Sequence, residues 1–162
     1  MKYAAPVIAC ALFLGGAAQA RDSLGVFERW GAFRDAKIPR CYAISEPVKD
    51  NHQSRWRPFA AVGYWPKKSV HGQMHFRLSR EKAPKAQVSL SIGARRFTLT
   101  AGGADAWAPD KRVDAAIIAA IRSGTSMSVQ ATGKNGAPFA DVYALRGAAT
   151  AMDAAALGCA RL

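Results

Sequence analysis

The fold class of this chain is decided by the stretch Val88-Ser89-Leu90-Ser91-Ile92-Gly93-Ala94-Arg95-Arg96-Phe97-Thr98-Leu99-Thr100. Apolar residues alternate with Ser, Arg and Thr on both sides of Gly93-Ala94, a dipeptide that suits a tight turn. Alternation of this kind buries one face of each strand and leaves the other in water, which is typical of an antiparallel sheet. The stretch therefore predicts a β-hairpin.

The same period of two recurs along the chain. A second hairpin is expected over residues 126–131 and 140–145, and four earlier segments have a strand pattern. These earlier segments are residues 30–34, 41–45, 59–65 and 70–78. In the second hairpin the residues expected to face the core are Met127, Val129, Tyr143 and Leu145.

Two late segments have helical spacing. The first covers residues 111–123 and follows Asp110, whose carboxylate can accept hydrogen bonds from the free amides of a first helical turn. Gly124 stands where a left-handed residue commonly ends a helix. The second covers residues 148–159 and places Cys159 on its inward face. These elements predict a mainly β fold, either β-sandwich-like antiparallel sheets or one strongly bent sheet, with two helices at its margins, one of them ending the chain.

The first twenty residues have the pattern of a secretory signal peptide. Lys2 precedes an apolar stretch, and Ala18-Gln19-Ala20 provides the small residues required for cleavage. We expect cleavage after Ala20, a single domain over residues 21–162, and a periplasmic or secreted location. No later segment is long and apolar enough to predict a transmembrane helix. A lipobox ending at Cys10 is the alternative, and it would predict an acylated N-terminus at that cysteine.

Removal of the signal would leave two cysteines, Cys41 and Cys159. An even number of cysteines in an exported chain indicates a disulfide in an oxidising compartment. The alternative is a nucleophilic thiol, which needs an activating group, and neither cysteine has an obvious one beside it. The sequence therefore predicts a structural disulfide between Cys41 and Cys159.

The chain is strongly basic, with 23 Lys and Arg against 11 Asp and Glu and a formal net charge of +12. An excess of this size favours acidic partners. The cationic residues concentrate in one part of the chain and on the neighbouring hairpin, and aromatic residues such as Trp56 and Trp65 lie near them in sequence. The predicted anion-binding residues are Lys67, Lys68, Arg77, Arg80, Lys82, Lys85, Arg95 and Arg96.

This combination of charges and rings can bind nucleic acid, but an exported protein rarely meets it. We expect no nucleic-acid partner and instead an anionic glycolipid, peptidoglycan or an acidic host surface. Two alternatives remain: the basic residues form only a solvated surface, or the protein is a structural or chaperone-like module that binds other proteins at its sheet edges.

The motifs of the common catalytic and cofactor sites are missing from the sequence. There is no nucleophile elbow, glycine-rich phosphate loop or dinucleotide fingerprint. His71 and His75 have a metal-like spacing, but on a strand they would share a face about 13 Å apart, too far for one ion. We therefore expect no catalytic site, no metal site and no cofactor.

With these elements in place, the chain resembles the invasion-associated locus B family. The likeness covers nearly all of residues 21–162 and consists of short stretches in a fixed order. They are residues 30–33, residues 41–47 with their Cys-Tyr pair, residues 88–107, residues 119–127, the Asp141-x-Tyr143-x-Leu145-x-Gly147 pattern and Cys159. Residues 137–140 depart from the family, which usually has small hydroxyl residues there.

The resemblance implies an exported envelope protein with a mainly β fold, linked in pathogens to entry into host cells. It implies no defined catalytic site.

Overall fold

The computed structural model describes residues 21–35, 37–49 and 54–160. The predicted signal peptide and Cys10 lie outside these residues. Ten strands form one antiparallel sheet in the order β1-β2-β3-β4-β5-β8-β7-β6-β9-β10. The strands are β1 (Asp22–Phe27), β2 (Trp30–Asp35), β3 (Arg40–Ser45), β4 (Phe59–Trp65), β5 (Val70–Arg77), β6 (Val88–Ile92), β7 (Arg95–Gly102), β8 (Asp105–Trp107), β9 (Ser126–Thr132) and β10 (Pro138–Ala144). A 3-10 turn, η1 (Pro66–Lys68), and two helices, α1 (Lys111–Ser123) and α2 (Ala148–Cys159), complete the fold.

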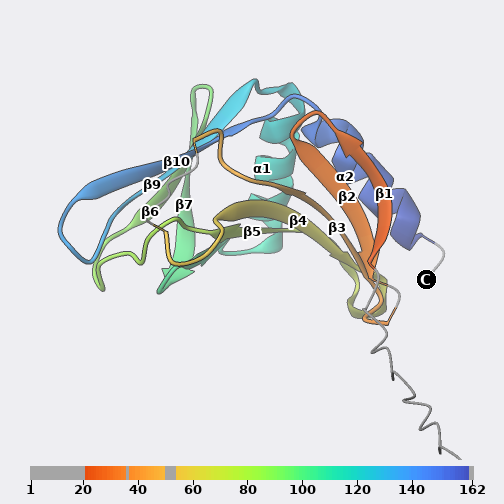
Figure 1. The fold of residues 1–162 in the computed structure, drawn as a ribbon, viewed down its shortest axis with the longest axis horizontal. Helices are drawn as coiled ribbons and strands as arrows, with labels where there is room; N and C mark the ends of the chain where they lie inside the picture. Colours follow the sequence, from red (N-terminus) through yellow and green to blue (C-terminus); the bar gives the residue numbers. More distant parts are fainter. Residues whose placement is uncertain (1–20, 36, 50–53, 161–162) are drawn as a thin grey trace, which may run out of the picture.

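The sheet is strongly bent, and β7 carries the bend. Its first part pairs with β6, whereas Thr100 to Gly102 pair with β8. In Figure 1, β2 to β5 arch across the molecule while β6, β9 and β10 extend to the left. The predicted fold class is confirmed, in the form of one bent sheet rather than two separate ones.

The last strand, β10, is tied back to the first part of the sheet. The amide of Val48 donates to the carbonyl oxygen of Val142 at 2.7 Å, and the indole Nε1 of Trp30 donates to that of Ala144 at 2.8 Å. Trp30 is completely buried. The two ends of the sheet therefore meet around a shared core.

Both helices have the predicted bounds. Asp110 caps α1 by accepting a hydrogen bond from the amide of Val113 at 2.8 Å, as expected. Asp114 fastens α1 to β5, because its carboxylate accepts from the amide of Met74 at 2.7 Å. Helix α2 packs on β1 to β4. Neither helix of the described chain is long and apolar enough to cross a membrane.

The predicted role of Gly124 is wrong. Its φ is −88°, so it does not end α1 in the left-handed conformation. A Cβ at this position would lie 2.8 Å from Ile92 and 2.9 Å from Leu145. Glycine is therefore required at position 124 by close packing against these side chains and not by backbone conformation.

The predicted disulfide is confirmed. Cys41 and Cys159 form a bridge with a Cα–Cα distance of 5.7 Å across a sequence separation of 118 residues. Both cysteines are buried. The bridge joins β3, the third strand of the sheet, to the end of the last helix.

Candidate binding surface on the concave face of the sheet

One face of β2 to β5 carries no helix. Residues such as Ala43 and Val62 point toward α2 and the core, so their strand neighbours occupy the opposite face. In Figure 1 these strands arch over an open side of the molecule. A groove of about 230 Å³ lies on this side and is lined by Arg21, Arg40, Tyr42, Ile44, Phe59, Ala61, Gly63, Trp65, Gln73 and His75. We call this surface the concave groove.

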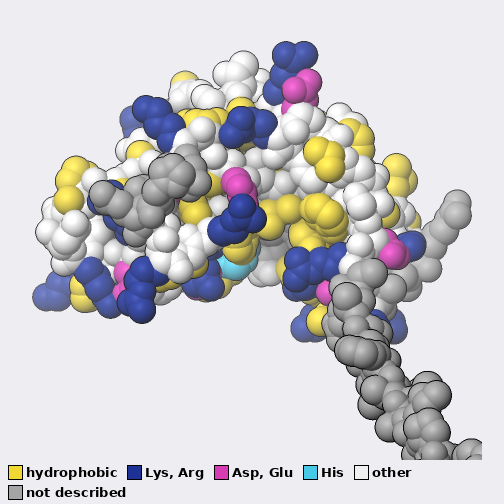
Figure 2. All heavy atoms as spheres, viewed as in Figure 1, with side chains coloured by type: hydrophobic (Ala, Val, Ile, Leu, Met, Phe, Trp, Pro, Cys, Tyr) yellow, Lys and Arg dark blue, Asp and Glu magenta, His cyan; other side chains and the backbone are white. Residues whose placement is uncertain are grey.

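The rim of the concave groove is aromatic. His75 stacks on Trp107, with ring centroids 5.2 Å apart and planes 4° apart, and meets Phe59 edge to face at 5.1 Å. These rings come from three strands, and the register of β4, β5 and β8 sets them side by side. Figure 2 shows apolar side chains and a histidine side chain where the lower outline of the molecule is hollowed, with Lys and Arg side chains on both sides.

The floor of the concave groove is made of small residues covered by large ones. A Cβ at Gly63 would collide with the six-membered ring of Trp65, so this indole folds back over the glycine. On β2, outside the groove, Phe33 covers Gly31 in the same way, at 2.7 Å from a Cβ placed there. Glycine at these positions lets a ring lie close to the backbone. The rings are thereby held on the sheet rather than projecting freely into water.

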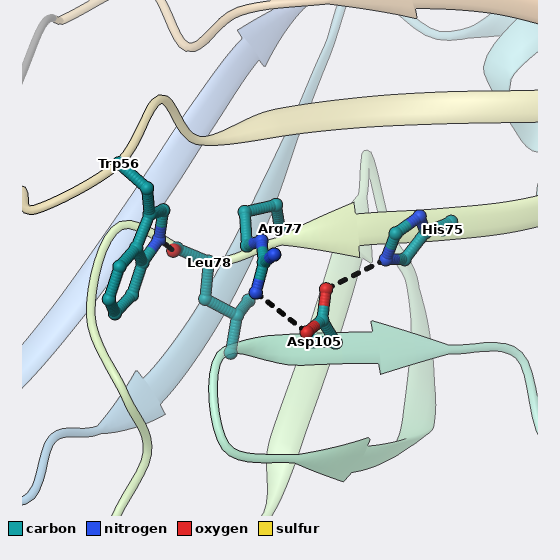
Figure 3. A network of polar contacts seen from close by, with 5 residues as sticks. All are labelled: Trp56, His75, Arg77, Leu78 and Asp105. Atoms are coloured by element: carbon teal, nitrogen blue, oxygen red, sulfur yellow. Dashed lines mark hydrogen bonds and ion pairs between the residues drawn. The ribbon is translucent and has the colours of Figure 1, made fainter.

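A polar network fixes the histidine of the concave groove. The carboxylate of Asp105 on β8 accepts from His75 Nε2 at 2.9 Å and from Arg77 Nη1 at 2.8 Å (Figure 3). Asp105 thereby engages the Nε2 atom of His75, and the stacked ring of Trp107 holds the orientation of the imidazole.

Arginine side chains pair with rings around the concave groove. The guanidinium of Arg40 lies 5.4 Å from the ring centre of Tyr42, and that of Arg77 lies 5.7 Å from the ring centre of Trp56. Trp56 is itself fixed by its indole Nε1, which donates to the carbonyl oxygen of Leu78 at 2.7 Å (Figure 3). Such contacts hold a guanidinium flat on an aromatic face.

The charges of this surface sum to an excess of positive charge. Asp35 pairs with Arg40 at 3.5 Å, and Asp105 pairs with Arg77 at 2.8 Å. Arg21 also lines the concave groove. Three arginines therefore accompany two carboxylates, and both carboxylates are engaged by arginines.

The eight predicted anion-binding residues do not all lie together. Lys67 and Lys68 form the η1 turn between β4 and β5, whereas Arg95 and Arg96 begin β7. Arg95 lines a hollow together with Ser123, the last residue of α1. These two basic pairs therefore lie on different turns of the sheet.

The other four predicted residues lie between these two turns in the sequence. Arg77 pairs with Asp105 beside His75, and Arg80 lines a separate hollow with Arg55 and Lys134. The ammonium group of Lys82 donates to the backbone carbonyls of residues 83 and 84, and Lys85 is exposed. None of the eight lines the concave groove, and Arg77 comes nearest to it through the carboxylate that it shares with His75.

The expectation that His71 and His75 share a face of the sheet is wrong. The pairing of β4 with β5 shifts register at a bulge, and Gly72 has a φ of 110°. Beyond this bulge His71 pairs with Tyr64 and lines a hollow beside α1, whereas His75 lines the concave groove. Among the described residues, no group of three or more His, Cys, Asp or Glu is arranged to hold a metal ion.

Tyr42, Phe59 and Trp107 belong to this surface and were missed in the sequence. The available signal was on the strands themselves. In residues 41–45 and 59–65 the positions between the core residues are occupied by Tyr, Ile and Phe, where a one-sided sheet normally has polar residues. An apolar outward row on a sheet indicates a second, covered face.

Comparisons with protein-family models, curated proteins and solved structures find no match to this chain.

Proposed function

We propose that this protein is an exported, non-catalytic protein of the bacterial cell envelope that binds an anionic partner in its concave groove. The observation that carries the proposal is the row of half-buried rings, including Tyr42, Phe59 and Trp65, with Arg40 and Arg77 beside it. The partner is an anionic glycolipid, peptidoglycan or an acidic host surface, and not nucleic acid.

Rings left partly in water on a helix-free face support a binding role. Tyr and Trp combine a large apolar surface with a polar group, and both are enriched where proteins bind ligands. Arginine adds a planar set of donors that matches carboxylate and phosphate groups. A surface with both components is suited to an amphipathic, negatively charged partner.

Three observations support export. Residues 1–20 have the signal-peptide pattern, and Cys41 and Cys159 form a disulfide, which persists in oxidising compartments. The resemblance to the invasion-associated locus B family agrees with this location. Cleavage after Ala20 would also place a new α-amino group at Arg21, on the border of the concave groove.

A binding role is favoured over covalent catalysis by the chemistry of the lining. The described residues that line the concave groove include no Ser, Thr or Cys, so His75 has no nucleophile there to activate. Both cysteines of the proposed mature chain are in the disulfide. The Asp105–His75 pair is then an oriented hydrogen-bonding group and not part of a catalytic triad.

The test is co-sedimentation of the purified protein with an isolated cell-envelope fraction, at about 20 mM and about 150 mM NaCl, which brackets strong and weak screening. We expect binding that weakens with salt and is lost in the triple variant Arg21→Gln/Arg40→Gln/Arg77→Gln. The matched control is Lys67→Gln/Lys68→Gln/Arg95→Gln, which removes the same charge elsewhere. Salt-independent binding, or equal losses in both variants, would overturn the proposal.

A second candidate is a module that binds other proteins at a sheet edge. Strand β1 ends the sheet on the side opposite β10, and its Val26 is 71% exposed. Edge strands of this kind can pair with another chain. Chemical cross-linking in intact envelopes distinguishes the candidates, because a protein partner cross-linked through β1, with no groove-dependent envelope binding, would favour this one.

A further inference from the structure

We propose that the ligand of the concave groove is an acidic polysaccharide, a chain of sugar rings that carry carboxylate groups. This inference rests on the proposed function and names the ligand class. It is drawn from four features: which contacts the sheet face offers, the size of the groove, the pairing of rings with polar groups, and the surplus of arginine.

The first feature is that a sheet face offers side chains only. Strands β3 and β4 are paired on both sides, so their backbone amides and carbonyls are used within the sheet, and β5 pairs with β8 from His75 to Arg77. An extended peptide binds a sheet mainly by adding a strand to a free edge. The part of the concave groove on β3 and β4 has no such edge, and this argues against a peptide as its main ligand.

The second feature is size. At about 230 Å³ the groove is smaller than the range of about 300–1,000 Å³ typical of pockets that enclose a whole small molecule. It has room for a ring-sized group over Ala61, between Phe59 and the indole of Trp65, which itself covers Gly63. A chain of rings can use such a groove one unit at a time while the rest of the chain stays in water.

The third feature is the alternation of rings with hydrogen-bonding groups. Gln73 and the imidazole of His75 are polar groups between Trp65 and Phe59, and all four residues line the groove. A lipid tail would leave these polar groups without partners, at a cost in free energy. A sugar ring has an apolar C–H face that can rest on the negative face of an aromatic ring, and hydroxyl groups around its edge.

The fourth feature is charge. Arg40 and Arg77 each lie against an aromatic ring, at 5.4 and 5.7 Å, so a guanidinium and an apolar surface are neighbours at both places. A sugar acid has the same neighbours, a carboxylate beside a C–H face. Arginine binds carboxylates through parallel hydrogen bonds, and Arg21 adds a third cation.

The test is calorimetric titration of the full mature protein with hexagalacturonate at low salt. Neutral cellohexaose and poly-glutamate are the comparison ligands, because the first lacks charge and the second lacks sugar rings. We expect hexagalacturonate to bind at least about tenfold more tightly than either, which corresponds to about 1.4 kcal/mol. Tryptophan fluorescence, to which Trp65 contributes, is expected to change on binding.

Two variants connect the binding to the rings. Trp65→Ala is expected to weaken hexagalacturonate binding about tenfold, as the loss of one stacking ring. Gly63→Ala keeps the indole but displaces it, so it should also weaken binding. Phe139→Ala is the control, since Phe139 is a half-buried ring on β10 outside the groove. Unfolding curves confirm that each variant is folded.

The outcomes separate this inference from the proposed function. If poly-glutamate binds as tightly as hexagalacturonate and Trp65→Ala has no effect, the surface recognises only negative charge. This result would overturn the proposal that the ligand is a polysaccharide. If cellohexaose binds as tightly as hexagalacturonate, the proposal that the polysaccharide must carry carboxylate groups is overturned. If the envelope fraction binds in a salt-dependent, groove-dependent way but hexagalacturonate does not, only the present inference fails. If neither binds, the proposed function fails with it.

Discussion

Gly147 connects β10 to α2 with a φ of 86°, in the left-handed region that glycine adopts without strain. A Cβ at this position would also collide with the carbonyl oxygen of Phe27. We expect Gly147→Ala to lower the free energy of unfolding by about 2 kcal/mol or more, measured by urea denaturation. Gly102→Ala is the control, because φ is not positive there and a Cβ would meet nothing within 4 Å. Similar losses in both variants would contradict this account.

Asp141, a second residue with a specific role, is buried on β10 and accepts a hydrogen bond from the amide of Ser79 at 2.8 Å. Burial raises the pKa of this carboxyl above its ordinary value, and the hydrogen bond from the Ser79 amide offsets part of the rise. The folded protein therefore binds this proton at a higher pH than the unfolded chain does. Stability from this group falls as pH rises between the unfolded and the folded pKa.

Asp141→Asn removes that titration. We expect the unfolding free energy of the wild type, relative to this variant, to increase as the pH is lowered from about 7 to about 4. Urea denaturation at a series of pH values measures the difference. A relative decrease over the same interval would mean that the ionised form is the stabilised one, and that Ser79 and Arg80 outweigh burial.

At the scale of elements, the disulfide fixes α2 to β3. Reduction of the chain entropy of the unfolded state predicts a stabilisation of about 4–5 kcal/mol for a loop of this length. We expect Cys41→Ala/Cys159→Ala to lower the free energy of unfolding by about 2–5 kcal/mol. Ala151→Ser/Ala155→Ser, on the buried face of α2, controls for altered packing with the bridge intact. A loss below about 1 kcal/mol in the cysteine variant would mean that packing alone positions the helix.

On the scale of the whole molecule, Trp30 holds the two ends of the bent sheet together. Trp30→Phe would leave the carbonyl oxygen of Ala144 without its indole donor and create a cavity in the core. We expect a loss of about 1–3 kcal/mol in the free energy of unfolding. Trp65→Phe, on the concave face, should change it by less than about 1 kcal/mol. If both substitutions lower the free energy of unfolding equally, Trp30 has no special role in joining the ends of the sheet.

Much of the secondary structure was predictable because side-chain period is a local property. The hairpin at Gly93-Ala94, the bounds of both helices and the cap at Asp110 follow from it. Strand β1 was missed because its pattern is broken by a bulge and by Gly25, whose φ is 139°. Strand β8 has only three residues, too few to show a period.

The binding surface was less predictable than the elements that build it. The basic residues and Trp65 stand out in sequence, but Arg40 and Tyr42 on β3, Phe59 on β4 and Trp107 on β8 are brought together from three different strands. The bulge at Gly72 then separates His71 from His75, which an unbroken strand would have kept on one face.

The sequence by itself determined most of the strands, the two helices and the cysteine pair, because alternation and capping depend on neighbouring residues and the disulfide follows from an even number of cysteines. The tertiary structure alone decided that the sheet is one bent surface and that its helix-free side gathers rings and arginines. The physical reason is that alternation says which residues of a strand face the core but not which strands become neighbours. Those neighbours are chosen by hydrogen bonding and packing between residues far apart in the chain, such as Trp30 and Ala144.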